Sequence, residues 1–459
     1  MTSNKCPFHY KLPSLMDIHT ITSLPWTTLY TQSAEENVTS SSVMATYALA
    51  MTVMFTVFVF AIEHALDHRQ ALAYKITTFP KMLEETVSKI DDEKKAAAKK
   101  DESKEKEEEE GDKSKKDLDK DKPLLPQLKE KFTKAQCYGT DKLEFGMFSA
   151  VYGLFESVIF LLVGFLPYIW DYSVSLGEDY FGLNESDNEI KITLIFLLVI
   201  TVIGTITSLP FELYSTFRIE KKHGFNKQTP ALFFTDKVKS LFLSCLIGGP
   251  FVAALLKIIK WGGEHFYVYV WAFMFIFSVF MMTIVPVVIM PMFNKYEPLP
   301  DAELKTRIYA LADRLQYPLT KLFVMDGSKR SSHSNAFMFG FGKNKRIVLF
   351  DTLMDQVSDD EILAILGHEL GHWKLGHTWS NFIVTQLYTG ASFYCFSLCY
   401  KAIDLYRAFG FDGIDRPIPT IIALLLFFQT IWAPVDKILS FALTIFSRMN
   451  EFAADRFSV

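Results

Sequence analysis

Two histidines and a glutamate lie at the spacing of a zinc-binding helix in the last third of the sequence, in the run His368-Glu369-Leu370-Gly371-His372. Residues four apart on an α-helix share one face, so both imidazoles can reach a single ion. Glu369 lies one step around the helix, beside the remaining coordination position. Zn²⁺ accepts two neutral imidazole nitrogens, and a neighbouring carboxylate can take a proton from its bound water. The spacing predicts a hydrolytic zinc site; the alternative is a helix with two structural histidines.

The third ligand of such a site is expected far downstream. His377 is closer, but at about 100° per residue it points away from His368. We interpret it as a histidine at the C-terminal end of the helix, where the helix dipole favours a basic side chain. Glu451 lies 79 residues after His372 (451 − 372 = 79) and four residues before Asp455. A ligating carboxylate followed one turn later by a second carboxylate can hold a zinc-bound imidazole in its tautomer. Glu451 is therefore the predicted third ligand.

The composition is that of a membrane protein. The 459 residues are 50% hydrophobic and 15% aromatic, and the mean hydropathy is +0.17. The net charge of −5 and the lack of a basic stripe with interleaved aromatics exclude a nucleic-acid-binding protein. Five scattered cysteines, an odd number, argue against a disulfide-stapled secreted domain.

Seven stretches approach the roughly 20 apolar residues that a membrane-spanning helix needs. They are residues 43–62, 146–170, 191–211, 240–260, 265–293, 379–402 and 418–446. The fourth carries Gly248-Gly249-Pro250 and the seventh carries Pro434 and Asp436, which lipid tolerates only where neighbouring helices or water satisfy the freed polar groups. We expect a multi-span α-helical membrane protein of about seven transmembrane helices.

The loops predict the orientation of these spans. Basic residues cluster in the loop after the first span and in the loop between the third and fourth, whereas intervening loops are short or acidic. Because basic loops stay in the cytosol, odd-numbered spans are expected to exit there, with residues 1–42 in the lumen. Asn37 and Asn184 are weak matches to lumenal glycosylation acceptors.

Two blocks are expected in the cytosol. The loop 63–145 contains a low-complexity Lys/Glu tract at 91–122, interpreted as a solvated linker, with an interaction role as the alternative. The block 294–377 has helical periodicity over 302–315 and strand-like runs at 322–325 and 346–350. The histidine helix is expected to begin near Asp359, capped by the Asp359-Asp360 pair. This second block predicts a small α+β domain.

Several long runs resemble the type I CaaX prenyl proteases, which are zinc metallopeptidases with seven membrane spans. The resemblance extends from about Glu130 to Val459. It rests on the histidine helix and on three further runs: 220–226 (EKKHGFN), 327–336 (GSKRSSHSNA) and 343–353 (KNKRIVLFDTL). It implies that the seven helices enclose a large chamber in the membrane, and that the small cytosolic α+β domain is a zinc metallopeptidase domain facing that chamber.

The same resemblance implies a substrate and a location. Prenylated CaaX proteins end in Cys-aliphatic-aliphatic-X with a farnesyl or geranylgeranyl group on the Cys, and they would be cleaved after that Cys. The lipid of the substrate would lie in the apolar chamber. The protein would reside in the membrane of the endoplasmic reticulum or the inner nuclear membrane, with its zinc site toward the cytosol.

The resemblance also implies the roles of individual residues. One Zn²⁺ per chain would be held by His368, His372 and Glu451. Glu369 would be the general base, and Asp455 a partner of a zinc ligand or a proton donor. The edge strand that pairs with the substrate backbone would include Asn335, Ala336 and Phe337.

We expect three parts in the chain: a lumenal segment (1–42), an N-terminal membrane region (43–226) and a peptidase region (227–459). Members of the resembled family usually continue into a His-Pro-Pro segment, so the peptidase region is expected to be truncated at its C-terminus. Two other functions stay open. One is a membrane quality-control metallopeptidase that needs no prenyl group, and the other is a non-catalytic membrane scaffold or translocation-clearance factor.

Overall fold

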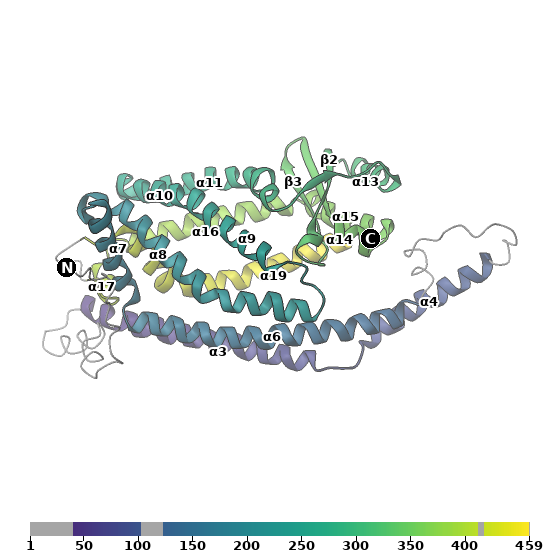
Figure 1. The fold of residues 1–459 in the computed structure, drawn as a ribbon, viewed down its shortest axis with the longest axis horizontal. Helices are drawn as coiled ribbons and strands as arrows, with labels where there is room; N and C mark the ends of the chain where they lie inside the picture. Colours follow the sequence, from purple (N-terminus) through teal and green to yellow (C-terminus); the bar gives the residue numbers. More distant parts are fainter. Residues whose placement is uncertain (1–39, 102–122, 412–416, 459) are drawn as a thin grey trace, which may run out of the picture.

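The structure is a computed structural model that describes residues 40–101, 123–411 and 417–458 (Figure 1). In this part of the chain seven helices are long and apolar enough to cross a membrane: Tyr47–Tyr74, Leu124–Leu162, Glu185–Glu220, Pro230–Trp261, Gly263–Phe293, His377–Cys399 and Thr420–Ser458. The predicted number of spans and the multi-span membrane class are confirmed. Asn37 and most of the Lys/Glu tract lie outside the described residues.

The spans are built from the following elements. The first is α3 (Ser40–Tyr74), followed by α4 (Lys81–Asp101), and the second is α6 (Leu124–Leu162), followed by α7 (Phe165–Phe181). The third joins α8 (Glu185–Tyr214) to the π-helical turn η1 (Ser215–Glu220). The fourth comprises α9 (Pro230–Leu243), η2 (Ser244–Gly248) and α10 (Gly249–Trp261), and the fifth η3 (Gly263–His265), α11 (Phe266–Ile284), η4 (Val285–Ile289) and α12 (Met290–Phe293). The sixth is α16 (His377–Cys399), followed by α17 (Ile403–Arg407), and the seventh comprises α18 (Thr420–Leu426), η6 (Phe427–Trp432) and α19 (Ala433–Ser458).

The boundaries predicted for the second span are wrong. The apolar run 146–170 is divided because α6 ends at Leu162 and the chain turns at Gly164, whose φ of 66° is left-handed. Glycine adopts this conformation without a steric penalty, so the turn is local to that residue. The helix instead extends in the other direction, to Leu124, through residues too polar for a hydropathy pattern to include.

The predicted interruptions of the spans appear as π-helical turns near prolines. The turn η2 lies directly before Gly249 and Pro250, and η6 ends two residues before Pro434. A third turn of this kind, η4, contains Pro286 and was not predicted. A proline has no N–H to donate, so the preceding turn must widen or kink. Each of these three spans therefore continues through its break without leaving the bundle.

The spans pack in sequence order and close a ring. The helix α3 lies beside α6, α6 contacts η1, α8 contacts α10, α10 lies beside α11, and α11 lies beside α16. The turn η6 of the seventh span contacts both α16 and α3, which closes the ring. In Figure 1, α3 and α6 run along one edge of the molecule, and α10 and α11 run along the opposite edge.

The molecule has two hydrophobic cores, one at each end of the ring. The first contains the buried side chains of Trp170, Phe196, Phe396 and Phe427 and lies at the end where α7 and α17 are found. The second lies in the domain at the opposite end. Between the two cores the spans bury little: α6 buries no side chain, α11 buries only its first turns, and α19 buries only Ala454.

The end domain has a four-stranded sheet with three helices, as the predicted α+β class requires. The strands are β1 (Tyr296–Pro298), β2 (Leu319–Met325), β3 (Ala336–Phe341) and β4 (Asn344–Phe350), in the order β1-β2-β4-β3. Only β2 and β4 are parallel. The helices are α13 (Glu303–Arg314), α14 (Asp351–Gln356) and α15 (Asp359–Lys374). The short elements β1 and α14 were not predicted.

The cap of α15 differs from the predicted one. Ser358 precedes the helix, and its backbone N–H donates to the Glu361 carboxylate at 2.8 Å, forming a capping box. Asp359 and Asp360 belong to the first turn, where their charges face the positive end of the helix.

Candidate metal centre

The metal-binding helix lies against the end of the seventh span. The helices α15 and α19 pack closely, and Gly371 faces α19 at this contact. A Cβ at this position would lie 3.0 Å from Phe457 Cδ1 and 3.4 Å from the backbone oxygen of Ala454. The missing side chain at 371 and the small, fully buried side chain at 454 therefore let the two helices meet.

This contact brings the three predicted ligands together. His368 Nε2 and His372 Nε2 are 3.1 Å apart, and Glu451 Oε2 lies 3.4 Å from the first and 3.5 Å from the second. Ligand atoms about 2.0–2.2 Å from a tetrahedral zinc ion would lie about 3.3–3.6 Å from one another. The three atoms fit such an ion, and no second group of this kind is found among the described residues.

The nitrogens on the far side of the two imidazoles have different partners. His368 Nδ1 lies 2.8 Å from Asp455 Oδ1, so the carboxylate one turn after Glu451 contacts a candidate ligand. His372 Nδ1 lies 2.9 Å from His377 Nδ1. Both contacts leave the Nε2 atoms free to face the metal position.

The position predicted for His377 is wrong. The helix α15 ends at Lys374, Gly376 turns the chain with a φ of 76°, and His377 begins α16. Helical arithmetic failed because it assumed one unbroken helix. The turn brings the His377 ring back toward His372 and buries it to 8% exposure. The glycine before it permits this reversal without requiring it.

Glu369 is partly buried beside the ligands. Burial raises the pKa of this carboxyl above the usual glutamate value, and the nearby Glu451 carboxylate acts in the same direction. The imidazoles of His368 and His372 oppose this shift. A carboxylate with a raised pKa is better matched to proton transfer near neutral pH than an exposed one.

The strand nearest the histidine helix is at the edge of the sheet. β3 pairs only with β4 within the described sheet, and it contacts α15. Asn335 precedes it, with its side-chain oxygen accepting the Ala336 N–H at 2.8 Å. Ala336 is buried and Phe337 is partly buried. The expected edge strand is therefore present in the described sheet, with the Ala336 N–H occupied by the Asn335 side chain.

The segment before β3 is fixed to the membrane region. The Arg330 guanidinium donates to both carboxylate oxygens of Asp236, at 2.8 and 3.1 Å, and to Asn294 Oδ1 at 2.8 Å. His333 stacks on Phe225 with ring centroids 4.3 Å apart. The two runs 220–226 and 327–336 thus meet in space.

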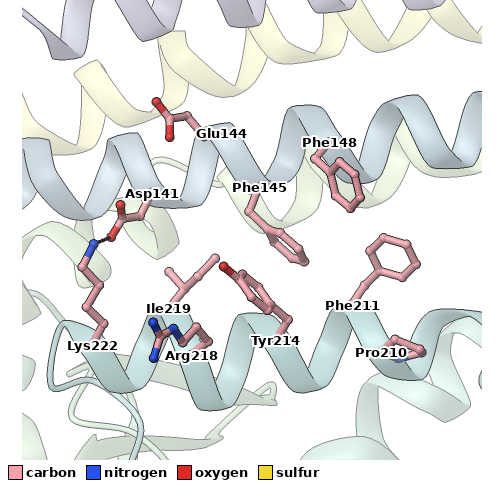
Figure 2. A pocket seen from close by; sticks show the side chains of 10 residues that line it. All are labelled: Asp141, Glu144, Phe145, Phe148, Pro210, Phe211, Tyr214, Arg218, Ile219 and Lys222. Atoms are coloured by element: carbon pink, nitrogen blue, oxygen red, sulfur yellow. Dashed lines mark hydrogen bonds and ion pairs between the residues drawn. The ribbon is translucent and has the colours of Figure 1, made fainter.

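A cleft opens beside this junction, between α6 and the end of the third span (Figure 2). Its volume is about 690 Å³, and one end is lined by aromatic side chains that include Phe145 and Tyr214, stacked 4.7 Å apart. At the other end Lys222 pairs with Asp141 at 2.5 Å. Sequence reasoning did not find the cleft, because its walls come from two spans whose contact no local pattern encodes.

Comparisons with known proteins agree with this arrangement. Residues 126–295 match the family described as CAAX prenyl protease N-terminal, five membrane helices, and residues 298–459 match peptidase family M48. The CAAX prenyl protease 1 homolog of Arabidopsis thaliana is 42% identical over 417 residues, which cover 91% of this chain and 87% of that protein. The Homo sapiens homolog is 41% identical, covering 73% of this chain and 78% of that protein. The crystal structure of S. mikatae Ste24p superposes with a TM-score of 0.75 at 35% identity, covering 89% of this chain and 88% of that one.

Seven membrane helices, an α+β end domain and a candidate histidine-carboxylate metal centre where that domain meets the last span are the features of a membrane-embedded metallopeptidase. The chain belongs to the CAAX prenyl proteases of peptidase family M48.

Proposed function

We propose that this protein is a zinc-dependent endopeptidase that removes the aaX tripeptide from prenylated CaaX proteins. The observation that carries the proposal is the convergence of His368, His372 and Glu451 from α15 and α19 at the spacing of one tetrahedral ion. The related proteins that bear the name CAAX prenyl protease 1 supply the substrate class.

The side chains around the metal position have different roles in the reaction. His368, His372 and Glu451 hold the zinc, which when bound polarises the scissile carbonyl and lowers the pKa of water. Glu369 takes a proton from the attacking water and returns it to the leaving amine. Asp455 acts as a partner of His368 rather than as a proton donor, because its carboxylate contacts Nδ1, the nitrogen turned away from the metal.

The substrate peptide pairs with the outer edge of β3, along Asn335, Ala336 and Phe337, and takes the place of the Asn335 side chain at the Ala336 N–H. Backbone hydrogen bonds of this kind hold an extended peptide regardless of its side chains. A peptidase that accepts many different C-terminal tails needs this mode of binding.

The isoprenoid lies among the spans. The two hydrophobic cores close the ring at its ends, and the spans between them bury few side chains, which supports a chamber in the membrane. We place this region (43–226 with spans four to seven of 227–459) in the endoplasmic reticulum membrane, residues 1–42 in the lumen and the zinc site in the cytosol, because the basic loops face that side.

The test is cleavage of a farnesylated CaaX peptide by purified protein in detergent. Glu369→Gln should retain zinc and lose at least about 100-fold in kcat, the lower range of general-base effects. Asp360→Asn, in the first turn of α15, is the control and should retain activity. Undiminished cleavage by Glu369→Gln would end the proposal. Equal cleavage of an unprenylated peptide would instead favour a quality-control peptidase.

A further inference from the structure

His377 contacts the metal centre from a different element than the other site residues. It is the first residue of α16, the sixth span, and its ring crosses that of His372 at 69° with centroids 5.1 Å apart. The two Nδ1 atoms are 2.9 Å apart, a hydrogen-bond distance. A side chain that merely filled a core position would not need a nitrogen at this point.

The direction of this hydrogen bond follows from the ligand chemistry. A neutral imidazole that binds a metal through Nε2 carries its proton on Nδ1, so His372 must donate from Nδ1. The atom opposite, His377 Nδ1, must then be an unprotonated acceptor, with the proton of His377 on Nε2. A single pair of tautomers satisfies both rings.

We propose that His377 is a positioning residue for the metal centre: it accepts a hydrogen bond from His372 and thereby fixes the tautomer and ring orientation of that ligand. The inference rests on the ligand role proposed for His372. It assigns His372 the same kind of support that Asp455 gives His368, but from a neutral side chain and from a membrane span. The sixth span thus contacts the candidate metal ligand His372 through one hydrogen bond.

Two substitutions separate the acceptor from the volume of the ring. His377→Asn places an amide oxygen near the former Nδ1 and keeps the acceptor, whereas His377→Leu keeps an apolar filling without it. Gln386→Leu removes another buried polar side chain from α16 and is the matched control. The measurements are zinc affinity by competition with a chromophoric chelator, the absorption spectrum of the cobalt-substituted protein, and the Tm of metal-stripped protein.

His377→Leu is expected to lose about 10- to 100-fold in zinc affinity, which is the loss found when partners of metal ligands are replaced. It is also expected to change the cobalt spectrum. His377→Asn and Gln386→Leu are expected to resemble the wild type, and all stripped proteins to melt alike. Wild-type affinity and spectrum in His377→Leu would overturn the proposal, as would an equal loss in His377→Asn at unchanged Tm. A wild-type protein that bound no zinc would instead refute the proposed function.

If His377→Leu does not fold, a measurement on the wild-type protein still tests the proposal. In zinc-loaded protein labelled with ¹⁵N-histidine, nuclear magnetic resonance is expected to show His372 protonated at Nδ1 and His377 protonated only at Nε2. A proton on His377 Nδ1 would overturn the proposal.

Discussion

The two candidate imidazole ligands are held from behind by chemically different groups. A carboxylate faces His368 and an imidazole faces His372. An anionic partner strengthens the ligand's donor nitrogen more than a neutral one does, because it stabilises the positive charge that the ring acquires on binding a cation. We therefore expect the two partners to contribute unequally to metal affinity.

Replacement of Asp455 by Asn is predicted to weaken zinc binding by about 10- to 100-fold, whereas His377→Asn, which keeps a neutral acceptor, is expected to bind zinc as the wild type does. The amide cannot supply the negative charge but keeps the size of the side chain. Chelator competition measures the effect. Arg456→Gln, the neighbouring substitution on α19, should leave the affinity unchanged, and equal affinities for Asp455→Asn and wild type would contradict the prediction.

Glu369 is predicted to destabilise the metal-stripped protein at neutral pH. Because its folded-state pKa is raised by burial, any stability it contributes is present below its unfolded pKa and is lost as the pH rises through the folded pKa. Glu369→Gln should therefore raise the Tm of stripped protein at pH 7.5, and the gain should shrink in acid, where the glutamate is protonated in both states. A gain that does not depend on pH would refute this explanation.

Among the elements, the contact of α15 with α19 determines whether a metal can be held. Gly371 and Gly367 lie one turn apart on α15, and both substitutions to alanine increase helix propensity. A Cβ at 367 would meet only Ser458 Cβ at an ordinary 3.7 Å, whereas a Cβ at 371 would meet Phe457 at 3.0 Å. Gly371→Ala therefore tests the spacing of α15 and α19, and Gly367→Ala is its control.

Gly371→Ala is predicted to weaken zinc binding, because the added methyl moves α19, and with it Glu451, away from the histidines. Gly367→Ala is predicted to bind zinc as the wild type does. The measurement is again chelator competition, with helix content from circular dichroism as the check on folding. Equal zinc affinity in the two variants would show that α19 can adjust without moving Glu451.

The link between Arg330 and Asp236 is predicted to hold the substrate strand in place. Arg330→Lys cannot make the two parallel hydrogen bonds, so the start of β3 should loosen, raising KM for the peptide more than it lowers kcat. Combining it with Asp236→Asn in a double-mutant cycle should give a coupling of about 1–3 kcal/mol. Lys329→Gln is the neighbouring control. A coupling near zero would mean that the two side chains act independently.

Sequence patterns predicted elements well where one periodicity extends over many residues. The seven spans and the strands β2 and β4 followed from apolar runs, and the candidate ligands followed from i, i+4 spacing. The failures lie at turns: Gly164 ends α6 and Gly376 reverses the chain before His377. A glycine permits such a turn but does not require it, so tertiary packing decides, and the position of His377 could not be derived.

In the whole molecule, a metal held by His368, His372 and Glu451 would join the end domain to the last span. Zinc removal is therefore predicted to lower the Tm, since an ion that binds only the folded state stabilises it by about 4 kcal/mol at 1,000 times its Kd. Thermal melting with and without chelator measures this. Glu451→Gln should melt at the temperature of the stripped wild type and should respond little to zinc. A Tm independent of zinc would show that packing alone joins the two parts.

The ring of spans and its two cores were not predictable from composition alone. Hydropathy gives the number of helices, but lipid-facing and chamber-facing side chains are both apolar, so it cannot tell a packed bundle from an open one. The contact of η6 with α3 joins the last span to the first and depends on every span between them. The chamber was expected from the resemblance to a known family. Its physical basis is that the spans bury few side chains between the two cores.

The order of the ligands along the chain has a consequence for biosynthesis. His368 and His372 precede the sixth span, and Glu451 lies near the end of the seventh span. A ribosome must make the sixth span and most of the seventh before the last donor arrives. A nascent polypeptide that lacks the end of the seventh span therefore has only two of the three candidate ligands, so we expect metal binding to be completed only once that span has been made.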